Sequence, residues 1–233
     1  MHDWFNNVAA MFERAFIVGD RWKLYIQGLG ITLQISVCAA ILGTIIGTAL
    51  AFMKLSTRKD GKKTVWNVIA NVYIDIIRGT PSVLQLLIMY FIVFAFSKNG
   101  IVIAILTFGI NSGAYVAEIV RGGILAVDRG QTEAGRSMGL THAQTFAYIV
   151  MPQAVKNILP PIGNEFIVLL KETAIVGYVG LSDLTRIANQ ISSRTYEPFM
   201  PLIGAAIIYF TIIKMLTILL GKLEKRLRVS DSR

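Results

Sequence analysis

Residues 131–165 read QTEAGRSMGLTHAQTFAYIVMPQAVKNILPPIGNE, and they change from hydrophilic to apolar along their length. The stretch begins with a polar helical pattern, reaches Gly139, and resumes at Thr141 before it continues into apolar sequence. A glycine after a helical stretch is typical of a helix C-terminus, and Thr141 and Gln144 have the spacing of a capping box. The pattern predicts a rigid helical elbow, residues 128–151, between two membrane spans.

Apolar sequence flanks this elbow on both sides. Of the 233 residues, 54% are hydrophobic, and they come in runs rather than in periodic stripes. Runs of about 18 or more apolar residues are long enough to cross the hydrocarbon core of a membrane. In the first run, Gly43 and Gly47 have the small-residue spacing that lets two helices approach closely. We therefore expect an all-α, polytopic membrane protein with a single transmembrane domain over residues 1–233.

The apolar runs predict five membrane spans, two of them irregular. Gly79 and Pro81 predict a break in the helix that leads into the second span, and Pro160 and Pro161 predict a discontinuous fourth span. Residues 1–23 mix aromatic and charged side chains, which is typical of a segment at the membrane interface. The five spans are expected at about residues 29–53, 82–96, 101–120, 152–179 and 199–220. Because 82–96 is short for a span, its helix is expected to start in the cytoplasmic interface and to continue through the break.

The formal net charge of +9 could suggest a nucleic-acid partner, but the basic residues do not form one clustered face. They lie in short segments beside the spans, as the positive-inside rule describes for cytoplasmic loops. Thirteen Lys and Arg residues fall in segments 54–63, 121–136 and 222–233, against six in segments 1–23, 98–100 and 182–198. This bias predicts an N-terminus outside the cell, a cytoplasmic C-terminus, contact with lipid and no nucleic-acid partner.

The third span contains polar residues within apolar sequence. Asn111, Tyr115 and Glu118 recur at a spacing that places them on one helix face, and Ser112 lies next to them. A polar face within a membrane must face protein or water. Glu118 could contribute to this face directly, or Arg121, one turn further on, could neutralise it.

Asn164 and Glu165 lie deep in the fourth span. A carboxylate near the centre of the membrane costs about 2.5–3.5 kcal/mol on insertion scales, so something must offset this cost. The alternatives are a water-filled cavity, a basic partner such as Lys171 or Lys214, or a cationic substrate. We expect Asn164 and Glu165, together with Asn111, Ser112 and Tyr115, to form a substrate site, while a purely structural ion pair of Glu165 stays open.

The sequence lacks the patterns of the common catalytic and metal sites. No GxxxxGK[ST] phosphate loop occurs, so this chain is not expected to bind and hydrolyse nucleotide. His2 and His142 are too few and too far apart for a metal site, and the single cysteine, Cys38, excludes an internal disulfide. We therefore expect a protein that is not an enzyme and that holds neither a metal nor a cofactor itself.

The elbow resembles the EAA loop of the permeases of ABC importers, whose pattern is EAA, three residues, G, nine residues and I-x-L-P. Gly135 stands where the pattern has its second alanine, and Met151 stands for the leucine. Segments 77–81, 111–121, 152–154 and 164–167 are similar to the branch of this family that takes up polar amino acids, and the resemblance covers about residues 20–226. The residues that match the loop pattern are Glu133, Ala134, Gly135, Gly139, Ile149 and Pro152.

This resemblance implies the permease subunit of a type I importer in the bacterial inner membrane. Such a permease pairs with a second permease, here expected to be an identical copy, and docks on two copies of an ABC ATPase that bind ATP and Mg²⁺. An extracytoplasmic binding protein delivers the substrate, a polar amino acid, with basic ones such as arginine included. In the family, the EAA loop forms the coupling helix that contacts the ATPase, which assigns that role to Glu133, Ala134, Gly135 and Gly139.

A stand-alone, proton-coupled secondary transporter of amino acids is the alternative. Glu118, Glu165 or Lys214 would then serve as proton sites. This interpretation accounts for charged residues within the spans but gives the hydrophilic elbow no role. A membrane scaffold, a third class, would not need polar groups at mid-depth.

Overall fold

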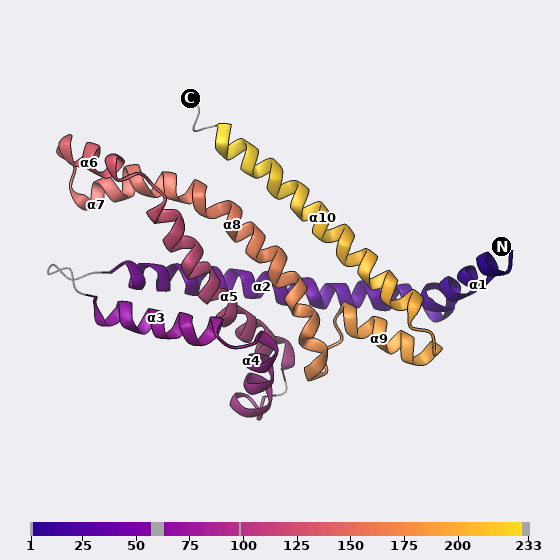
Figure 1. Ribbon diagram of the computed structural model, residues 1–233. Helices are drawn as coiled ribbons and strands as arrows, with labels where there is room; N and C mark the ends of the chain where they lie inside the picture. The colour runs from indigo at the N-terminus through magenta and orange to yellow at the C-terminus, as the bar shows by residue number, and fades with distance from the viewer. Residues whose placement is uncertain (1, 57–62, 98, 230–233) are drawn as a thin grey trace.

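The computed structural model describes residues 2–56, 63–97 and 99–229, so most of the basic segment 54–63 lies outside the described residues. The described chain consists of helices and short connections (Figure 1). The α-helices are α1 His2–Phe12, α2 Arg21–Leu55, α3 Val65–Arg78, α4 Ser82–Ile88, α5 Gly100–Leu125, α6 Arg129–Ser137, α7 His142–Thr145, α8 Met151–Glu172, α9 Leu184–Thr195 and α10 Phe199–Val229. Segments of π- or 3-10 helix are η1 Glu13–Ile17, η2 Val18–Asp20, η3 Met89–Val93, η4 Phe146–Val150 and η5 Thr173–Val179.

Several of these helices are suited to a membrane, which confirms the all-α, polytopic prediction. Within the described ranges, three helical segments are long and apolar enough to cross a bilayer, and a bent pair would make four. The three are Asn6–Leu55, Gly100–Leu125 and Phe199–Leu227, and the bent pair is Val65–Arg78 with Ser82–Val93. The predicted fourth span, α8, does not meet the same test of length and composition, so the count of five stays a prediction.

The predicted break in the second span is confirmed. The axes of the two helices on either side of residues 79–81 meet at an angle of 101°. Helix α3 ends where the N–H of Gly79 donates to the carbonyl of Asp75 at 2.9 Å, and extended backbone at Pro81 starts α4. A proline cannot supply the N–H that would continue α3, so the chain changes direction here.

The predicted break in the fourth span is wrong. Pro160 and Pro161 lie inside α8, which continues without interruption to Glu172. Each proline removes only one hydrogen bond, to the carbonyl four residues earlier, and packing against neighbouring helices keeps the helix intact. The departure from α-helical geometry comes later, at Thr173, where η5 begins.

Helices α2 and α5 cross with their backbones in close contact. Gly43 and Gly47 on α2, and Gly109 and Gly113 on α5, are buried at this crossing. A Cβ atom on Gly47 would lie 2.6 Å from the Cβ of Val116 and 2.7 Å from the carbonyl oxygen of Gly113. Small residues at this spacing are what close helix packing in a membrane requires. The contact fixes the rotation of α5 and therefore the direction of its polar face.

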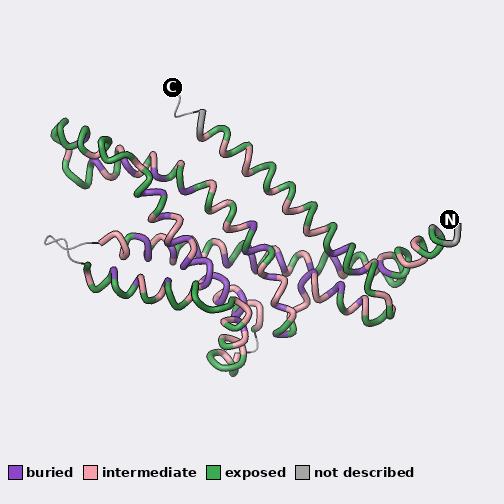
Figure 2. The backbone as a smooth tube through the Cα atoms, in the orientation of Figure 1, coloured by how far each residue is buried: buried purple, intermediate pink, exposed green. Residues whose placement is uncertain are grey.

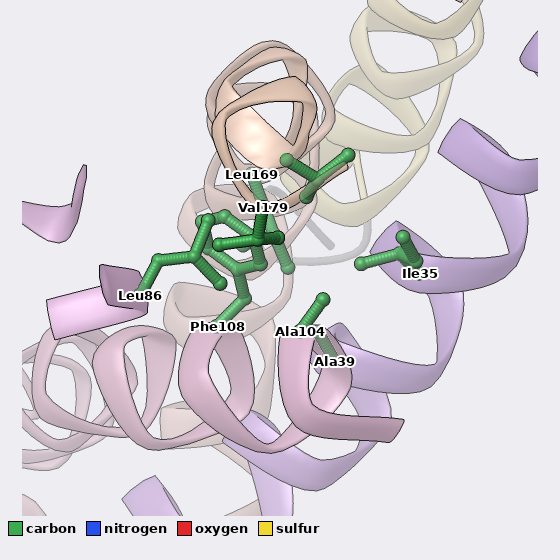
Figure 3. Close-up of a cluster of buried hydrophobic side chains, with 8 residues drawn as sticks. Ile35, Ala39, Leu86, Ala104, Phe108, Leu169 and Val179 are labelled. Carbon is green, nitrogen blue, oxygen red and sulfur yellow. The ribbon is translucent and has the colours of Figure 1, made fainter. Parts of the chain in front are cut away.

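One apolar cluster joins α2, α4, α5, α8 and η5 (Figure 3). Phe108 of α5 is fully buried at its centre, between side chains from the other four elements. This packing holds the C-terminal part of α8 against α5. The buried members are Ile35, Ala39, Leu86, Ala104, Phe108, Leu169, Val176 and Val179.

The two ends of the molecule are formed by different helices. Figure 1 shows α6, α7, the end of α2, the start of α3 and the C-terminal end of α10 toward one end, with α1 and α9 toward the other. The described parts of the three basic segments that were predicted to be cytoplasmic therefore lie toward the same end, namely residues 54–56, 63, 121–136 and 222–229. From His2, the N-terminal segment is helical up to a turn at Gly19 and Asp20, which have φ angles of 64° and 55°. Its position at the membrane interface stays a prediction.

Helix α9 begins at a buried cap. Asp183 is fully buried, and its carboxylate accepts hydrogen bonds from the N–H groups of Thr185 at 2.9 Å and Arg186 at 3.2 Å. Burial raises the pKa of Asp183, although these hydrogen bonds act against the shift. The N–H of Leu184 donates to Thr32 on α2 at 3.3 Å, so α9 is attached to α2 rather than lying loosely on the surface.

Helix α10 is the least buried of the candidate spans. Only 11% of its most apolar window is buried, compared with 61% for α5, and Figure 2 shows the same contrast. Large apolar side chains such as Ile207, Phe210 and Leu219 are exposed along it. A surface of this kind suits contact with lipid or with a second subunit.

Replacing Gly47 by leucine tests the helix crossing. The new side chain would collide with Val116 and the backbone of Gly113, so we expect a clear loss of thermal stability in detergent and a lower yield of folded protein. Gly30→Leu on the same helix is the control, because no atom lies within 4 Å of a Cβ built there. Equal melting temperatures of the two variants, measured by size-exclusion chromatography after heating, would contradict the close contact.

Candidate functional site

The elbow, residues 128–151, begins with a capped helix. Asp128 is the N-cap of α6, and its carboxylate accepts a hydrogen bond from the N–H of Gly130 at 2.6 Å. Helix α6 begins at Arg129, so Glu133 lies in its second turn and is exposed. Asp128 is therefore the acid at the positive end of the helix dipole.

The turn that follows α6 confirms that the helix ends just before Gly139. Its φ angle is +86°, the N–H of Gly139 donates to Arg136 at 3.0 Å, and the N–H of Leu140 donates to the carbonyl of Gly135 at 3.2 Å. A glycine adopts this left-handed conformation at little cost. The predicted capping box is also present, because the backbone N–H of Thr141 donates to the Gln144 side chain at 2.9 Å while the N–H of Gln144 donates to the Thr141 hydroxyl at 3.3 Å.

Gly135 has a different position from the other residues of the loop pattern. It is buried, and a Cβ at this position would lie 2.7 Å from Thr145 and 2.8 Å from Ile149. The missing side chain lets α6 fold back against α7 and η4. Glu133, Ala134 and Gly139 are exposed, so three of the four predicted coupling residues are available to a partner and the fourth holds the elbow together.

The elbow continues directly into the membrane. From His142 the chain is helical through α7, η4 and α8 to Glu172. Glu165 lies fourteen residues beyond the start of α8, which at the rise of an α-helix corresponds to about 21 Å. A displacement of the elbow along this direction would therefore move Glu165 with it.

Glu165 contacts the polar face of α5. The hydroxyl of Ser112 donates a hydrogen bond to its carboxylate at 3.0 Å. Ser112 and Asn111 are buried, Glu165 is half-buried and Asn164 is exposed. Within the described ranges, neither Lys171 nor Lys214 forms an ion pair with Glu165, and its hydrogen-bond partner is a hydroxyl group.

The bend between α3 and α4 supplies two residues that sequence reasoning did not assign to this site. The side-chain amide of Asn111 donates to Gln85 at 2.9 Å, and the guanidinium carbon of Arg78 lies 5.1 Å from the centre of the Tyr115 ring. Arg78 and Gln85 lie on either side of the break at residues 79–81. In the sequence, Gly79 and Pro81 predict this break but not the contacts of its neighbours. The five predicted substrate residues therefore lie on two helices, and four of them, all except Asn164, have a hydrogen bond or a cation–π contact with a neighbouring element in the described part of the chain.

Glu118 belongs to a separate ionic cluster. It pairs with Arg121 at 3.1 Å, which confirms that it is neutralised within its own helix, and it also pairs with Lys54 at the end of α2. The side chain of Asn67 on α3 donates to the carbonyl of the same Lys54. The cluster thus joins α2, α3 and α5 on the side of the molecule where the elbow lies. Within the described ranges, no group of three or more metal-binding side chains is present.

Comparison with known proteins identifies the family. A family model described as "Binding-protein-dependent transport system inner membrane component" matches residues 43–229. The chain is 41% identical over 209 residues to an arginine transport system permease protein of Bacillus subtilis, covering 88% of this chain and 93% of the relative. It is 36% identical over 210 residues to a glutamine transport system permease protein of Escherichia coli, covering 88% and 94%.

Two solved structures are similar as well. A crystal structure of an amino acid ABC transporter with histidines matches with a TM-score of 0.81 and 46% identity, over 88% of this chain and 94% of that one. An inward-facing structure of the MetNI methionine ABC transporter matches with a TM-score of 0.76 over 88% and 97%. Its identity of 19% supports the fold alone.

Replacing Lys54 by glutamine tests the ionic cluster. The variant leaves the charge of Glu118 with Arg121 as its one ion-pair partner among the described residues. The site is largely buried, because the side chains of Lys54 and Glu118 are 18% and 21% exposed. We expect destabilisation of about 1–3 kcal/mol, measured as a lower melting temperature. Lys23→Gln, which breaks the exposed pair with Asp20, should change stability by less than about 1 kcal/mol. Equal effects of the two variants would contradict a stabilising role of Lys54.

Proposed function

The chain belongs to the family of binding-protein-dependent transport system inner membrane components, and we propose that it forms the translocation path of an ATP-driven importer for a polar amino acid. In this proposal, two copies of an ABC ATPase bind ATP and Mg²⁺ and dock on the cytoplasmic side. A second copy of the permease completes the path, and an extracytoplasmic binding protein delivers the substrate. The N-terminus lies outside and the C-terminus lies in the cytoplasm. The named relatives and the exposed elbow support this arrangement.

The Ser112–Glu165 contact is the observation on which the proposed substrate site depends. It joins α5 to α8 through a carboxylate that has no ion-pair partner in the described part of the chain. A cationic substrate would offset the cost of holding such a group within the membrane. Asn164, Asn111 and Tyr115 supply amide and hydroxyl groups for the remainder of the amino acid.

We propose a basic amino acid as the preferred substrate. An arginine, lysine or histidine side chain would pair with Glu165, whereas a glutamate side chain would be repelled by it. A relative at 41% identity is an arginine transport system permease protein, and the structure at 46% identity is described with histidines. Relatives at 36% identity are named as glutamine permeases, so a neutral polar substrate is the second candidate.

The elbow is the proposed contact with the ATPase. Glu133, Ala134 and Gly139 are exposed around α6, and Gly135 fixes α6 against η4. Because α7, η4 and α8 form one helical path, closure of the ATPase would move α8 and, with it, Glu165 relative to α5. This motion is how ATP hydrolysis would open and close the substrate site.

The alternative, a stand-alone proton-coupled transporter, is less well supported. Two cations already neutralise Glu118, which removes one of its three candidate proton sites. Lys214 is exposed on α10 and forms no ion pair with Glu165 within the described residues. The elbow would still have no role in such a protein.

Glu165→Gln tests the substrate site. Loss of the carboxylate charge removes a charge-assisted interaction of about 1.5–3 kcal/mol, so uptake of arginine in reconstituted importer should need an approximately 10- to 100-fold higher concentration. Neutral substrates should be affected much less. Glu13→Gln, at an exposed position in the N-terminal segment, is the matched control and should have no effect. If the variant complex assembles and takes up basic amino acids as the wild type does, the substrate site lies elsewhere.

Gly139→Val tests coupling through the elbow. No atom lies within 4 Å of a Cβ built at Gly139, so the effect should come from the backbone, where φ of +86° costs a β-branched residue about 1–3 kcal/mol. We expect loss of the ATPase from the purified complex, or ATP hydrolysis that no longer drives uptake. Glu133→Lys should weaken docking by reversing an exposed charge.

The control for the elbow is Gly122→Val on α5, where a side chain would also meet open space but the φ angle is ordinary. It should keep both the ATPase and normal uptake. Normal coupled uptake in Gly139→Val and in Glu133→Lys would show that the elbow only connects two helices.

A further inference from the structure

A cavity of about 790 Å³, called the groove below, lies between η5 and α9, away from the proposed substrate site. Figure 1 places α9 at the end of the molecule opposite α6 and α7. If the elbow faces the cytoplasm, this cavity faces the outside of the cell. Its floor comes from η5, including Ala174, Ile175 and the exposed Tyr178, and its wall is α9.

The wall of this groove is the polar face of α9. Residues 186, 189, 190 and 193 recur at helical spacing on that face, while the opposite face of α9 is buried. Among the described residues, no aspartate or glutamate lines the groove, whereas two arginines do. The polar side chains are Thr185, Arg186, Asn189, Gln190, Ser193 and Arg194.

Arg186 is held in place with one donor unused. Its guanidinium donates to the carbonyl of Gly177, and its Nε is buried without a hydrogen-bond partner in the described part of the chain. Arg186 also lies in the first turn of α9, where the helix dipole disfavours a cation. A fixed cation at a helix start, in a groove lined by a second arginine and by no aspartate or glutamate among the described residues, indicates a site for an anionic group.

We propose that this groove receives an acidic surface segment of the extracytoplasmic binding protein. Arg186 and Arg194 are eight residues apart, about 12 Å along the helix, so a single amino acid carboxylate cannot engage both anchors in the way that two acidic side chains can. The inference rests on the proposed function, because it requires that a binding protein reaches this face.

A second copy of the chain is a poorer occupant. An isologous contact through this groove would bring the same arginines of both copies toward one another, and like charges at an interface are repulsive. An acidic partner segment would instead meet complementary charge, increase the rate of encounter and make it dependent on salt.

The test uses the assembled importer in liposomes and the purified, amino acid-loaded binding protein that stimulates the wild type. Arg194→Glu reverses an exposed charge in the groove, and Gln190→Glu adds one with almost no change of shape. We expect each variant to raise the half-saturating concentration of binding protein for ATPase stimulation by about tenfold. Basal hydrolysis and the maximal stimulated rate should stay unchanged, and the difference from wild type should shrink at high salt.

Arg14→Glu is the matched control, since Arg14 is an exposed arginine of the N-terminal segment outside the groove. The proposal is overturned if the groove variants saturate as the wild type does, or if Arg14→Glu raises the half-saturating concentration equally. It is also overturned if free arginine binds the importer without binding protein and the groove variants lose that binding. A wild-type importer that no binding protein stimulates would contradict the proposed function itself and therefore this inference with it.

Discussion

The backbone contact between α2 and α5 is the constraint on which the other contacts depend. Because Gly43 and Gly47 have no side chains, α5 lies close enough to α2 for Glu118 to reach Lys54. The same rotation of α5 turns Ser112 toward Glu165 on α8. In lipid, helices gain little from hydrophobic burial, so close van der Waals packing and polar contacts of this kind decide which helices associate. The bend of α3 and α4 then adds Arg78 and Gln85 to the polar face that the crossing has oriented.

The continuous path from α7 to α8 connects the elbow with the proposed substrate site. Gly135 and the capping box fix the elbow at one end, and the apolar cluster around Phe108 holds the other end of α8 against α5. The prolines at 160 and 161 do not interrupt this path. An unbroken helix transmits displacement along its axis, whereas a discontinuous one would absorb part of it in the break. The continuity of α8 is therefore as important to the proposed coupling as the exposed residues of α6.

Local sequence patterns predicted the features that local backbone chemistry controls. The turn at Gly139, the capping box at Thr141 and the break at Pro81 depend on residues within four positions of one another, and all three are confirmed. The break expected at Pro160 was wrong because neighbouring helices outweighed the local cost of proline. Arg78 and Gln85 could not be assigned to the polar face, since they reach it only through a bend whose angle no spacing specifies. Glu118 shows the same limit: Arg121 was identifiable at one helical turn, but Lys54 is 64 positions away.

Helix α10 makes this fold responsive to the bilayer that surrounds it. Its 31 residues correspond to about 46 Å at the rise of an α-helix, longer than a hydrocarbon core of about 30 Å, so it accommodates the bilayer by tilting or by extending beyond it. Protein contacts hold α10 near its start, where its buried Ala205 packs with α9, and again at Leu220, which lies against Gly163 of α8. A thicker bilayer would favour a smaller tilt of α10 and would change how α10 packs against α9. The tilt of one exposed helix would thus link the acyl-chain length of the lipid to the packing of α9, at the end of the molecule opposite the elbow.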